Sequence, residues 1–244
     1  MTQFKDYNHS LIQLAISTLA LLFAFVACAP ENEAIESKCP EGAVDLGIVM
    51  TRADGTTYKL YWAKSNLSTS GLCANETDYG DYYAWGETEP KEDYSWSTYK
   101  YGTNRSGPFS KYNTQDSYRT VDNKTVLDSK DDAARVKLGG KWRLPTTEEW
   151  NELLRKCSFE WVDINGVVGL LVTGKNGNTI FLPPAGYRNG TKVYYPAHNG
   201  YYGSSSLVTN FPYTAWGVSF PYLYGILSGT GERLYGFSIR PVSE

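Results

Sequence analysis

Six carboxylates in short runs are the residues of this 244-residue chain best suited by type to do chemistry. Paired Asp and Glu side chains hydrolyse glycosidic bonds, because one protonates the leaving oxygen while the other acts on the opposite side of the sugar. Four of the six fall in predicted first helical turns, where acidic residues favour the helix dipole. We therefore expect no catalytic residue and no enzyme, and an envelope glycan hydrolase is the weakest of three hypotheses. The six are Glu87, Glu89, Asp131, Asp132, Glu148 and Glu149.

Other catalytic and metal-binding patterns are missing from the sequence. After the first 27 residues there is one histidine, His198, beside a loop-like Asn-Gly, and there is no Gly-x-Ser-x-Gly elbow. Cysteine and histidine do not cluster at zinc spacing. Asp128, Asp131 and Asp132 offer oxygen ligands for calcium but lack the Asp-x-Asp-x-Asp-Gly pattern. We expect no metal site and no cofactor.

Composition favours binding over catalysis. The chain contains 20 Tyr and 7 Trp, and tyrosine suits binding surfaces because it supplies contact area and a hydroxyl at low entropic cost. The formal net charge is −3, and it stays −3 without residues 1–27, which carry one Lys and one Asp. Without a basic patch, the chain is not expected to bind nucleic acid.

The first residues look like a lipoprotein signal peptide. An apolar run follows Lys5 and closes with Ala27-Cys28, which looks like a lipobox, where the peptide is cleaved and the cysteine is lipidated. We predict a signal peptide over 1–27 and lipidation of Cys28. The alternative is an uncleaved signal anchor.

The stretch 28–43 is predicted to be a polar tether, because it has too little apolar surface to fold. Its acidic pair, Glu31 and Glu33, resembles surface-export signals of Bacteroidetes lipoproteins. We expect the protein in the outer membrane, held by its lipid anchor alone and displayed at the cell surface.

The remaining residues, 44–244, are predicted to form one domain rich in short strands. Asp-Gly and Asn-Gly dipeptides between apolar runs indicate hairpin turns. The segment 88–125 is polar and Tyr-rich and is expected to wrap the core as an ordered loop. Strands are expected at 44–51, 57–64, 159–163, 167–173, 179–182, 200–206, 215–220 and 235–240.

Two helices are predicted in the middle of the chain. Asp128 is expected to cap a short helix that ends at Gly139-Gly140. Thr146 and Glu149 form a capping-box pattern, followed by apolar residues at helical spacing. Cys73 and Cys157 are expected to pair in an oxidising compartment, and the alternative is Cys39 with either of them.

Several motifs together resemble the Fibrobacter succinogenes major paralogous domain, a family common in Bacteroidetes lipoproteins. The match extends from about residue 44 to 242. Departures are Gly203, where the family has Trp after Gly-Tyr-Tyr, and the apolar stretch 221–228. The motifs are Asp78-Tyr-Gly-Asp-Tyr-Tyr-Ala-Trp-Gly-Glu-Thr88, Tyr112-Asn113, Leu127-Asp128, Asp131-Asp132-Ala133-Ala134, Trp142-Arg-Leu-Pro-Thr146, Phe181-Leu-Pro-Pro-Ala-Gly-Tyr-Arg188, Gly200-Tyr-Tyr, Ser204-Ser205-Ser206 and Gly236-Phe-Ser-Ile-Arg-Pro-Val242.

The resemblance implies an α+β, C-type-lectin-like fold: small twisted antiparallel sheets, two short flanking helices and long ordered loops. It implies that the chain termini pair and that the C-terminal strands and loops make a ligand face. Some members resemble variable proteins of diversity-generating retroelements. The late cysteines of the related formylglycine-generating enzymes have no counterpart after Cys157, and Glu89-Pro90-Lys91 breaks the calcium motif of C-type lectins.

We therefore predict a surface lipoprotein that binds a protein or glycan on another cell or in the environment through residues 203–234, a segment open to diversification. Apolar residues in a predicted loop indicate a binding surface, and the alternative is that they complete a buried strand. A second hypothesis is a structural subunit or tip adhesin of a surface appendage. Trp216 and Phe220 are assigned to the core, and Arg240 to the scaffold. The predicted ligand-binding residues are Gly203, Tyr213, Tyr222, Leu223, Tyr224, Ile226 and Leu227.

Overall fold

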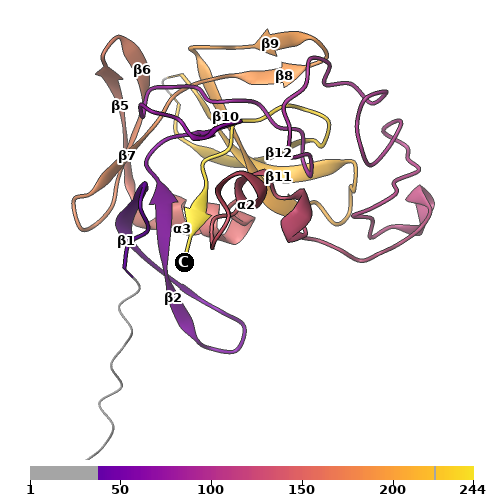
Figure 1. Ribbon diagram of the computed structural model, residues 1–244, viewed down its shortest axis with the longest axis horizontal. Coiled ribbons are helices and arrows are strands. Elements are labelled where there is room, and N and C mark those ends of the chain that lie inside the picture. Colours follow the sequence, from indigo (N-terminus) through magenta and orange to yellow (C-terminus); the bar gives the residue numbers. More distant parts are fainter. Residues whose placement is uncertain (1–37, 223) are drawn as a thin grey trace, which may run out of the picture. The chain divides into compact units, whose positions relative to one another are not determined.

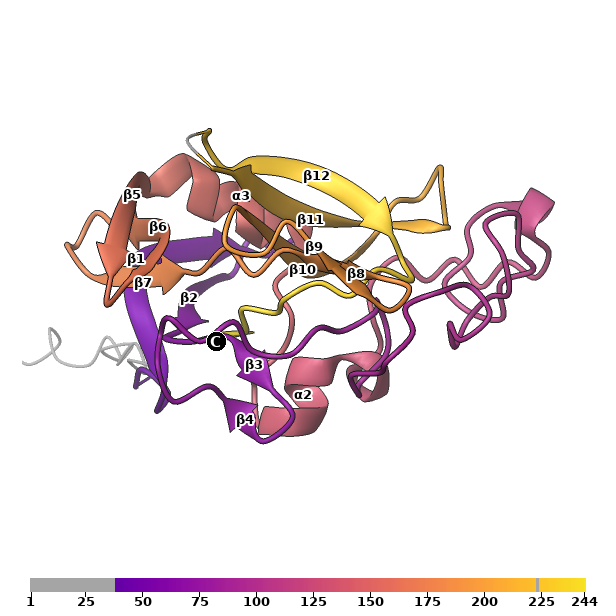
Figure 2. The same cartoon turned by 90° about the horizontal axis from the view of Figure 1, so that it is seen from above.

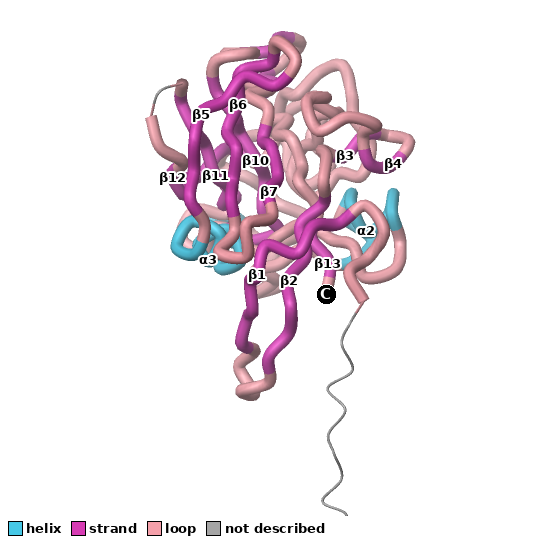
Figure 3. The backbone as a smooth tube through the Cα atoms, turned by 90° about the vertical axis from the view of Figure 1, so that its left-hand side faces the viewer, coloured by secondary structure: helices cyan, strands magenta, loops and turns pink. Residues whose placement is uncertain are grey.

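The first predicted hairpin joins the two ends of the domain. The computed structural model describes residues 38–222 and 224–244; the signal peptide, Cys28, most of the tether and Leu223 lie outside them. β1 (Ala43–Thr51) pairs with β2 (Thr57–Ala63), and β2 also pairs with β13 (Val242–Ser243). Figure 3 shows this hairpin reaching away from the other sheets. The termini of the domain therefore share one sheet, of order β1-β2-β13.

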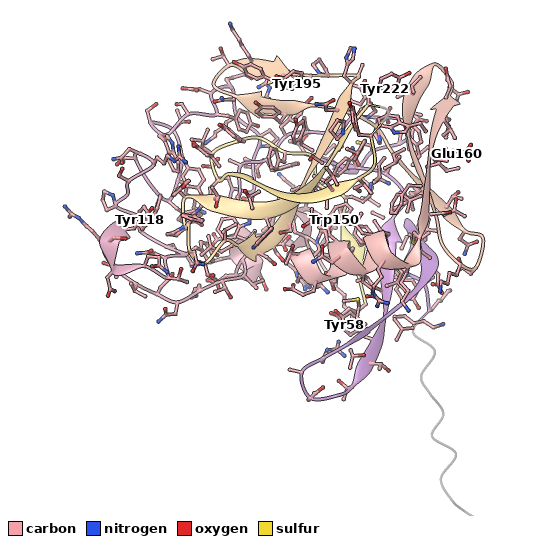
Figure 4. The ribbon with its side chains drawn as sticks, turned by 180° about the vertical axis from the view of Figure 1, so that it is seen from behind. Tyr58, Tyr118, Trp150, Glu160, Tyr195 and Tyr222 are labelled. Atoms are coloured by element: carbon pink, nitrogen blue, oxygen red, sulfur yellow. The ribbon has the colours of Figure 1, made fainter. Side chains whose placement is uncertain are left out.

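The helix with the capping box forms as predicted. It is α3 (Thr147–Lys156), and the Thr146 side chain accepts from the Glu149 backbone N–H while the Glu149 carboxylate accepts from the Thr146 N–H. Its apolar face is buried through Trp150 and Leu153. Trp150 lies where α3 meets the sheet behind it (Figure 4), and its indole donates to the Gly203 carbonyl at 3.2 Å.

The earlier helix begins later than predicted. A 3₁₀ turn covers Ser129–Asp131, and α2 (Ala133–Leu138) follows it. The capping residue is Asp132, whose carboxylate accepts from the Arg135 N–H at 2.9 Å, and not Asp128. Asp128 is unavailable because its carboxylate is ion-paired with Lys111 and Lys124. The predicted end at Gly139 is confirmed, since this residue has φ +69°.

The predicted meander also forms. Asn165 and Gly166 both have positive φ at its first turn, as a tight hairpin requires. Two minor hairpins and a third three-stranded sheet complete the fold (Figure 1). The strands are β5 (Ser158–Ile164), β6 (Val167–Thr173) and β7 (Thr179–Leu182) in the meander; β3 (Leu67–Ser68), β4 (Gly71–Leu72), β8 (Tyr187–Asn189) and β9 (Lys192–Tyr194) in the minor hairpins; and β10 (Asn199–Leu207), β11 (Thr214–Pro221) and β12 (Leu227–Glu232) in the third sheet.

The last predicted strand is misplaced. Residues 235–240 make only isolated bridges, such as Tyr202 with Ser238, whereas β12 forms where a loop was expected. β12 contains Gly229 and Gly231, and glycine lowers the strand propensity on which the prediction depended. The antiparallel sheets and the two α-helices of the described residues confirm an α+β domain.

Two apolar clusters form the core, one under α3 and one around the long segment 88–125. In the first, Trp62 and Trp150 have ring centroids 4.6 Å apart. In the second, aromatic rings surround Arg233, whose guanidinium is buried and donates to the Tyr99 hydroxyl at 2.8 Å. The expected scaffold role of Arg240 is confirmed, because it is buried and donates to backbone carbonyls. The segment 88–125 therefore packs into the core as an ordered loop.

The predicted disulfide does not form. Cys39, Cys73 and Cys157 are all free thiols. Cys157 lies at the end of α3 against the core, while Cys73 follows β4 and bonds through its backbone N–H to the Asn66 carbonyl. Burial raises the pKa of both thiols, and of Cys157 to about 11. No helix among the described residues is long and apolar enough to span a membrane.

Candidate ligand-binding cleft

One face of the β10–β12 sheet has a run of glycines at its centre. Gly217 of β11 lies opposite Gly203 on one side and opposite Gly229 of β12 on the other. Gly231 lies opposite Ala215 in the next row on that face. The opposite face carries Tyr202 and Phe220, which belong to the core under α3. The small residues therefore form a flat floor on the face away from α3.

Aromatic rings from distant segments surround this floor. Phe237 stacks on Tyr201, with ring centroids 5.7 Å apart and planes at 25°. Tyr187 of β8 contacts Tyr201 at 4.9 Å and Tyr235 at 5.3 Å. Figures 1 and 2 show how the β8–β9 hairpin reaches this region, beside the sheet of β10, β11 and β12.

Between the floor and these rings lies a cavity of about 160 Å³. The floor of this cavity is uncovered at Gly229, because a Cβ built there would meet no heavy atom within 4 Å. At Gly231 a Cβ would approach the Phe237 ring to 2.4 Å, so the ring already covers that part of the floor. The cavity, hereafter the aromatic cleft, is lined by Tyr187, Tyr201, Gly217, Val218, Ser219, Gly229, Thr230, Gly231, Tyr235 and Phe237.

Backbone hydrogen bonds fix the walls of the aromatic cleft. Phe237 exchanges two bonds with Tyr83, at 3.0 and 3.1 Å, and the Ser238 N–H donates to the Tyr201 carbonyl at 3.1 Å. The segment after β12 is therefore held between β10 and the loop at Tyr83. Walls held in this way are preformed, which lowers the entropic cost of binding.

The hydroxyls of Tyr187 and Tyr235 stay protonated at neutral pH. Burial raises the pKa of Tyr187 and of Tyr235 above the usual tyrosine range, and neighbouring hydroxyls and Glu232 add to the effect. A protonated phenol both donates and accepts hydrogen bonds. The cleft therefore offers apolar ring faces together with neutral polar groups, the combination typical of small-molecule sites.

A wider groove of about 600 Å³ adjoins the aromatic cleft and shares Tyr235 and Gly231 with it. Here Arg105 lies over the Tyr213 ring at 4.4 Å and donates to the Tyr213 hydroxyl at 3.1 Å. Trp216 also lines this groove. The open surface thus continues past the cleft along β11 and β12.

The predicted ligand-binding residues separate into three groups. Tyr213 lines the groove, and Leu227, 58% exposed, lies opposite the cleft residue Ser219. Tyr222 and Tyr224 are exposed in the β11–β12 turn beside Trp161, whose indole donates to the Tyr224 carbonyl at 3.2 Å. Neither tyrosine lines the cleft.

Two predicted contact residues do not line the aromatic cleft. Gly203 is buried, and a Cβ built on it would point toward Phe237. Gly203 is therefore part of the floor beneath this wall residue. Ile226 is partly buried against the core under α3, but it precedes β12 and completes no strand. Phe220 is buried as expected, but Trp216 is half-buried and lines the groove.

Sequence reasoning missed most of the cleft. Its walls come from Tyr187, Tyr201, Tyr235 and Phe237, which lie in different segments. One local signal was present: Gly229 and Gly231 are two residues apart, so in a strand both leave the same face bare. This signal is useful only once the segment has been recognised as a strand, β12.

Four of the six acidic residues considered for hydrolysis, namely Glu87, Glu89, Asp131 and Glu149, are held in ion pairs. Lys111 and Lys100 both bond the Asp131 carboxylate, and Tyr112 donates its hydroxyl to it at 2.7 Å. Burial alone would raise the pKa of Asp131, but these hydrogen bonds hold it well below the usual range. Lys111 also pairs with Asp128, so its ammonium group lies between two of the three carboxylates that were considered as calcium ligands.

Two other acidic candidates are engaged as well. Glu87 pairs with Lys91 at 2.9 Å, and Glu149 accepts from Arg143 at 2.7 Å. Neither lines the aromatic cleft. A carboxylate held by a cation is a poor proton donor, so these groups suit a structural role.

No protein-family model, curated protein or solved structure matches the chain. The family resemblance drawn from the motifs therefore stays a prediction.

Proposed function

We propose that this chain is a lipoprotein of the bacterial outer membrane, displayed at the cell surface through a lipid on Cys28, and that its domain binds a glycan in the aromatic cleft. The observation that carries the glycan proposal is the open floor at Gly229 beneath tyrosine and phenylalanine rings. A sugar ring presents apolar C–H faces and a rim of hydroxyls. It suits a pocket that pairs aromatic faces with a few polar groups.

A C-type-lectin-like fold is part of this proposal. Two observations support it: the domain's terminal strands share the β1-β2-β13 sheet, and two short helices accompany several small antiparallel sheets. In the family that the motifs resemble, the ligand face lies on the C-terminal strands and loops. The aromatic cleft draws most of its lining from residues 201–237, in agreement with that expectation.

The test is binding of the chain to an array of glycans, with Tyr187→Ala as the matched variant. We expect one glycan class to bind, and the variant to lose at least tenfold in affinity, about 1.4 kcal/mol. Circular dichroism controls for folding. A folded wild-type protein that retains no glycan would contradict the proposal.

A protein partner is the second candidate, because β12 is an edge strand. In the described part of the chain β12 hydrogen-bonds to β11 alone, and its outer edge is free to accept a strand from another chain. This geometry would serve an appendage subunit. Co-purification of a polymer containing this chain would favour it over the glycan proposal.

A further inference from the structure

Arg188 lies in a second cavity, separate from the aromatic cleft. It follows the cleft residue Tyr187 in β8, and successive side chains of a strand point to opposite faces. Its backbone is fixed by two hydrogen bonds with Gly236, both at 2.9 Å. The cavity has a volume of about 410 Å³ and is lined by Gly80, Asp81, Tyr82, Pro90, Lys91, Glu92, Tyr94 and Arg188.

The guanidinium of Arg188 is only partly used by the protein. Its Nη1 donates to the Lys91 carbonyl at 3.1 Å, and the rings of Tyr82 and Tyr94 lie 5.9 and 5.7 Å from its central carbon. Its Nε is buried and has no hydrogen-bond partner. No carboxylate of the described residues forms an ion pair with it.

The unused side of this guanidinium has a defined chemistry. Nε and Nη2 form the edge with which arginine binds a carboxylate through two parallel hydrogen bonds. A buried donor without a partner costs free energy, and a ligand that satisfies it gains that amount on binding. The buried Nε of Arg135 also lacks a partner, whereas the fully buried Arg233 and Arg240 each donate to several protein oxygens through Nε and both terminal nitrogens.

The rest of the cavity restricts the charge of the ligand. Asp81 and Glu92 line it beside Arg188, and the ammonium of Lys91 is engaged by Glu87. Two nearby carboxylates repel a dianion more strongly than a monoanion. We propose that Arg188 binds a carboxylate group of a small acidic ligand, at a site distinct from the aromatic cleft and independent of the glycan proposal.

Titration of the chain, labelled with ¹⁵N in its arginine side chains, with sodium acetate tests this site. We expect the Nε–H resonance of Arg188 to shift saturably with acetate, and not with sodium chloride at the same ionic strength. Since this readout uses the unmutated protein, it does not depend on a variant that folds. Equal, linear shifts with both salts would overturn the proposal.

Variants and further probes extend the test. Calorimetry should show that Arg188→Gln abolishes acetate binding, whereas Arg105→Gln, in the other groove, leaves it unchanged. Phosphate at alkaline pH should bind more weakly than acetate, and tighter phosphate binding would contradict the argument from Asp81 and Glu92. Preference for D-glucuronate over N-acetylglycine identifies a sugar acid as the source of the carboxylate, and the reverse preference identifies a peptide terminus. Glycan binding in the aromatic cleft should persist in Arg188→Gln, which separates the two sites.

Discussion

Phe237 lies directly over Gly231, so that a Cβ on this glycine would come within 2.4 Å of the ring. Two residues earlier on the same face, Gly229 has no such neighbour. β12 thus carries two glycines with different roles. Gly231 makes room for Phe237, a wall residue of the aromatic cleft, and Gly229 leaves the floor of the cleft open.

Alanine at these two positions should therefore have opposite consequences. Gly231→Ala forces Phe237 to move, and we expect a loss of about 1–3 kcal/mol in the free energy of unfolding, as for other overpacked sites. Gly229→Ala has room for its methyl group and a φ outside the left-handed region, so its stability should match or slightly exceed that of the wild type. Urea denaturation of both variants measures the difference, and equal destabilisation would contradict the described packing.

Glu149 is predicted to stabilise the fold and to play no part in binding. It is 1% exposed, caps α3, and accepts hydrogen bonds from Arg143 and Tyr58. Glu149→Gln breaks a buried ion pair and should cost about 3 kcal/mol. The neighbouring Glu148→Gln, at an exposed position, is the control and should change stability by less than about 0.5 kcal/mol. A stable Glu149→Gln protein would show that this ion pair contributes little.

Asp131 gives the stability a dependence on acid pH. Its folded pKa is lowered from 3.8, so its contribution is present above that value and is lost as the pH falls through and below it. Asp131→Asn should lose about 2 kcal/mol at neutral pH, typical of hydrogen bonds to a charged group. Denaturation at several pH values should show this difference shrinking below pH 3.8. The exposed Asp116→Asn serves as control, and a difference that does not depend on pH would argue against the ion-pair role of Asp131.

Tyr222 and Tyr224 test how far the ligand extends beyond the cleft. Both are exposed, Tyr224 by 71%, and Tyr222 contacts the Trp161 ring at 5.2 Å. The double substitution to Ala should cost about 1 kcal/mol of stability, the size of one aromatic pair. We expect it to weaken glycan binding less than Tyr187→Ala does. A greater loss than with Tyr187→Ala, measured by calorimetry, would move the principal contact to the turn.

Local chemistry made much of the fold predictable. The Thr146–Glu149 capping box and the turn at Asn165-Gly166 depend on neighbouring residues alone, and both form as predicted. Asp128 was chosen as a cap because it precedes the helical pattern, but Lys111, distant in sequence, takes its carboxylate. Competition of this kind is decided by tertiary contacts and leaves no mark on the local sequence.

The aromatic cleft was less predictable for the same reason. No strand was predicted between 220 and 235, although in the structure Gly229 and Gly231 are part of β12 and leave its face open. Tyr187 and Tyr235 come together only because β8 and the segment after β12 meet across the sheet. Exposed residues such as Tyr195 and Tyr222, labelled in Figure 4, are the easier ones to propose from composition.

Filling the floor of the aromatic cleft tests the central claim most directly. Gly229→Val places a β-branched side chain, which suits a strand, in the open space of the cleft, while Ser228→Val adds similar bulk at the preceding position of β12, outside the cleft lining. The measurement is the affinity of both variants for the glycan identified on the array. We predict that Gly229→Val folds and loses binding at least a hundredfold, about 2.7 kcal/mol, whereas Ser228→Val binds as the wild type does. Unchanged affinity in a folded Gly229→Val protein would contradict the assignment of the ligand to this cleft.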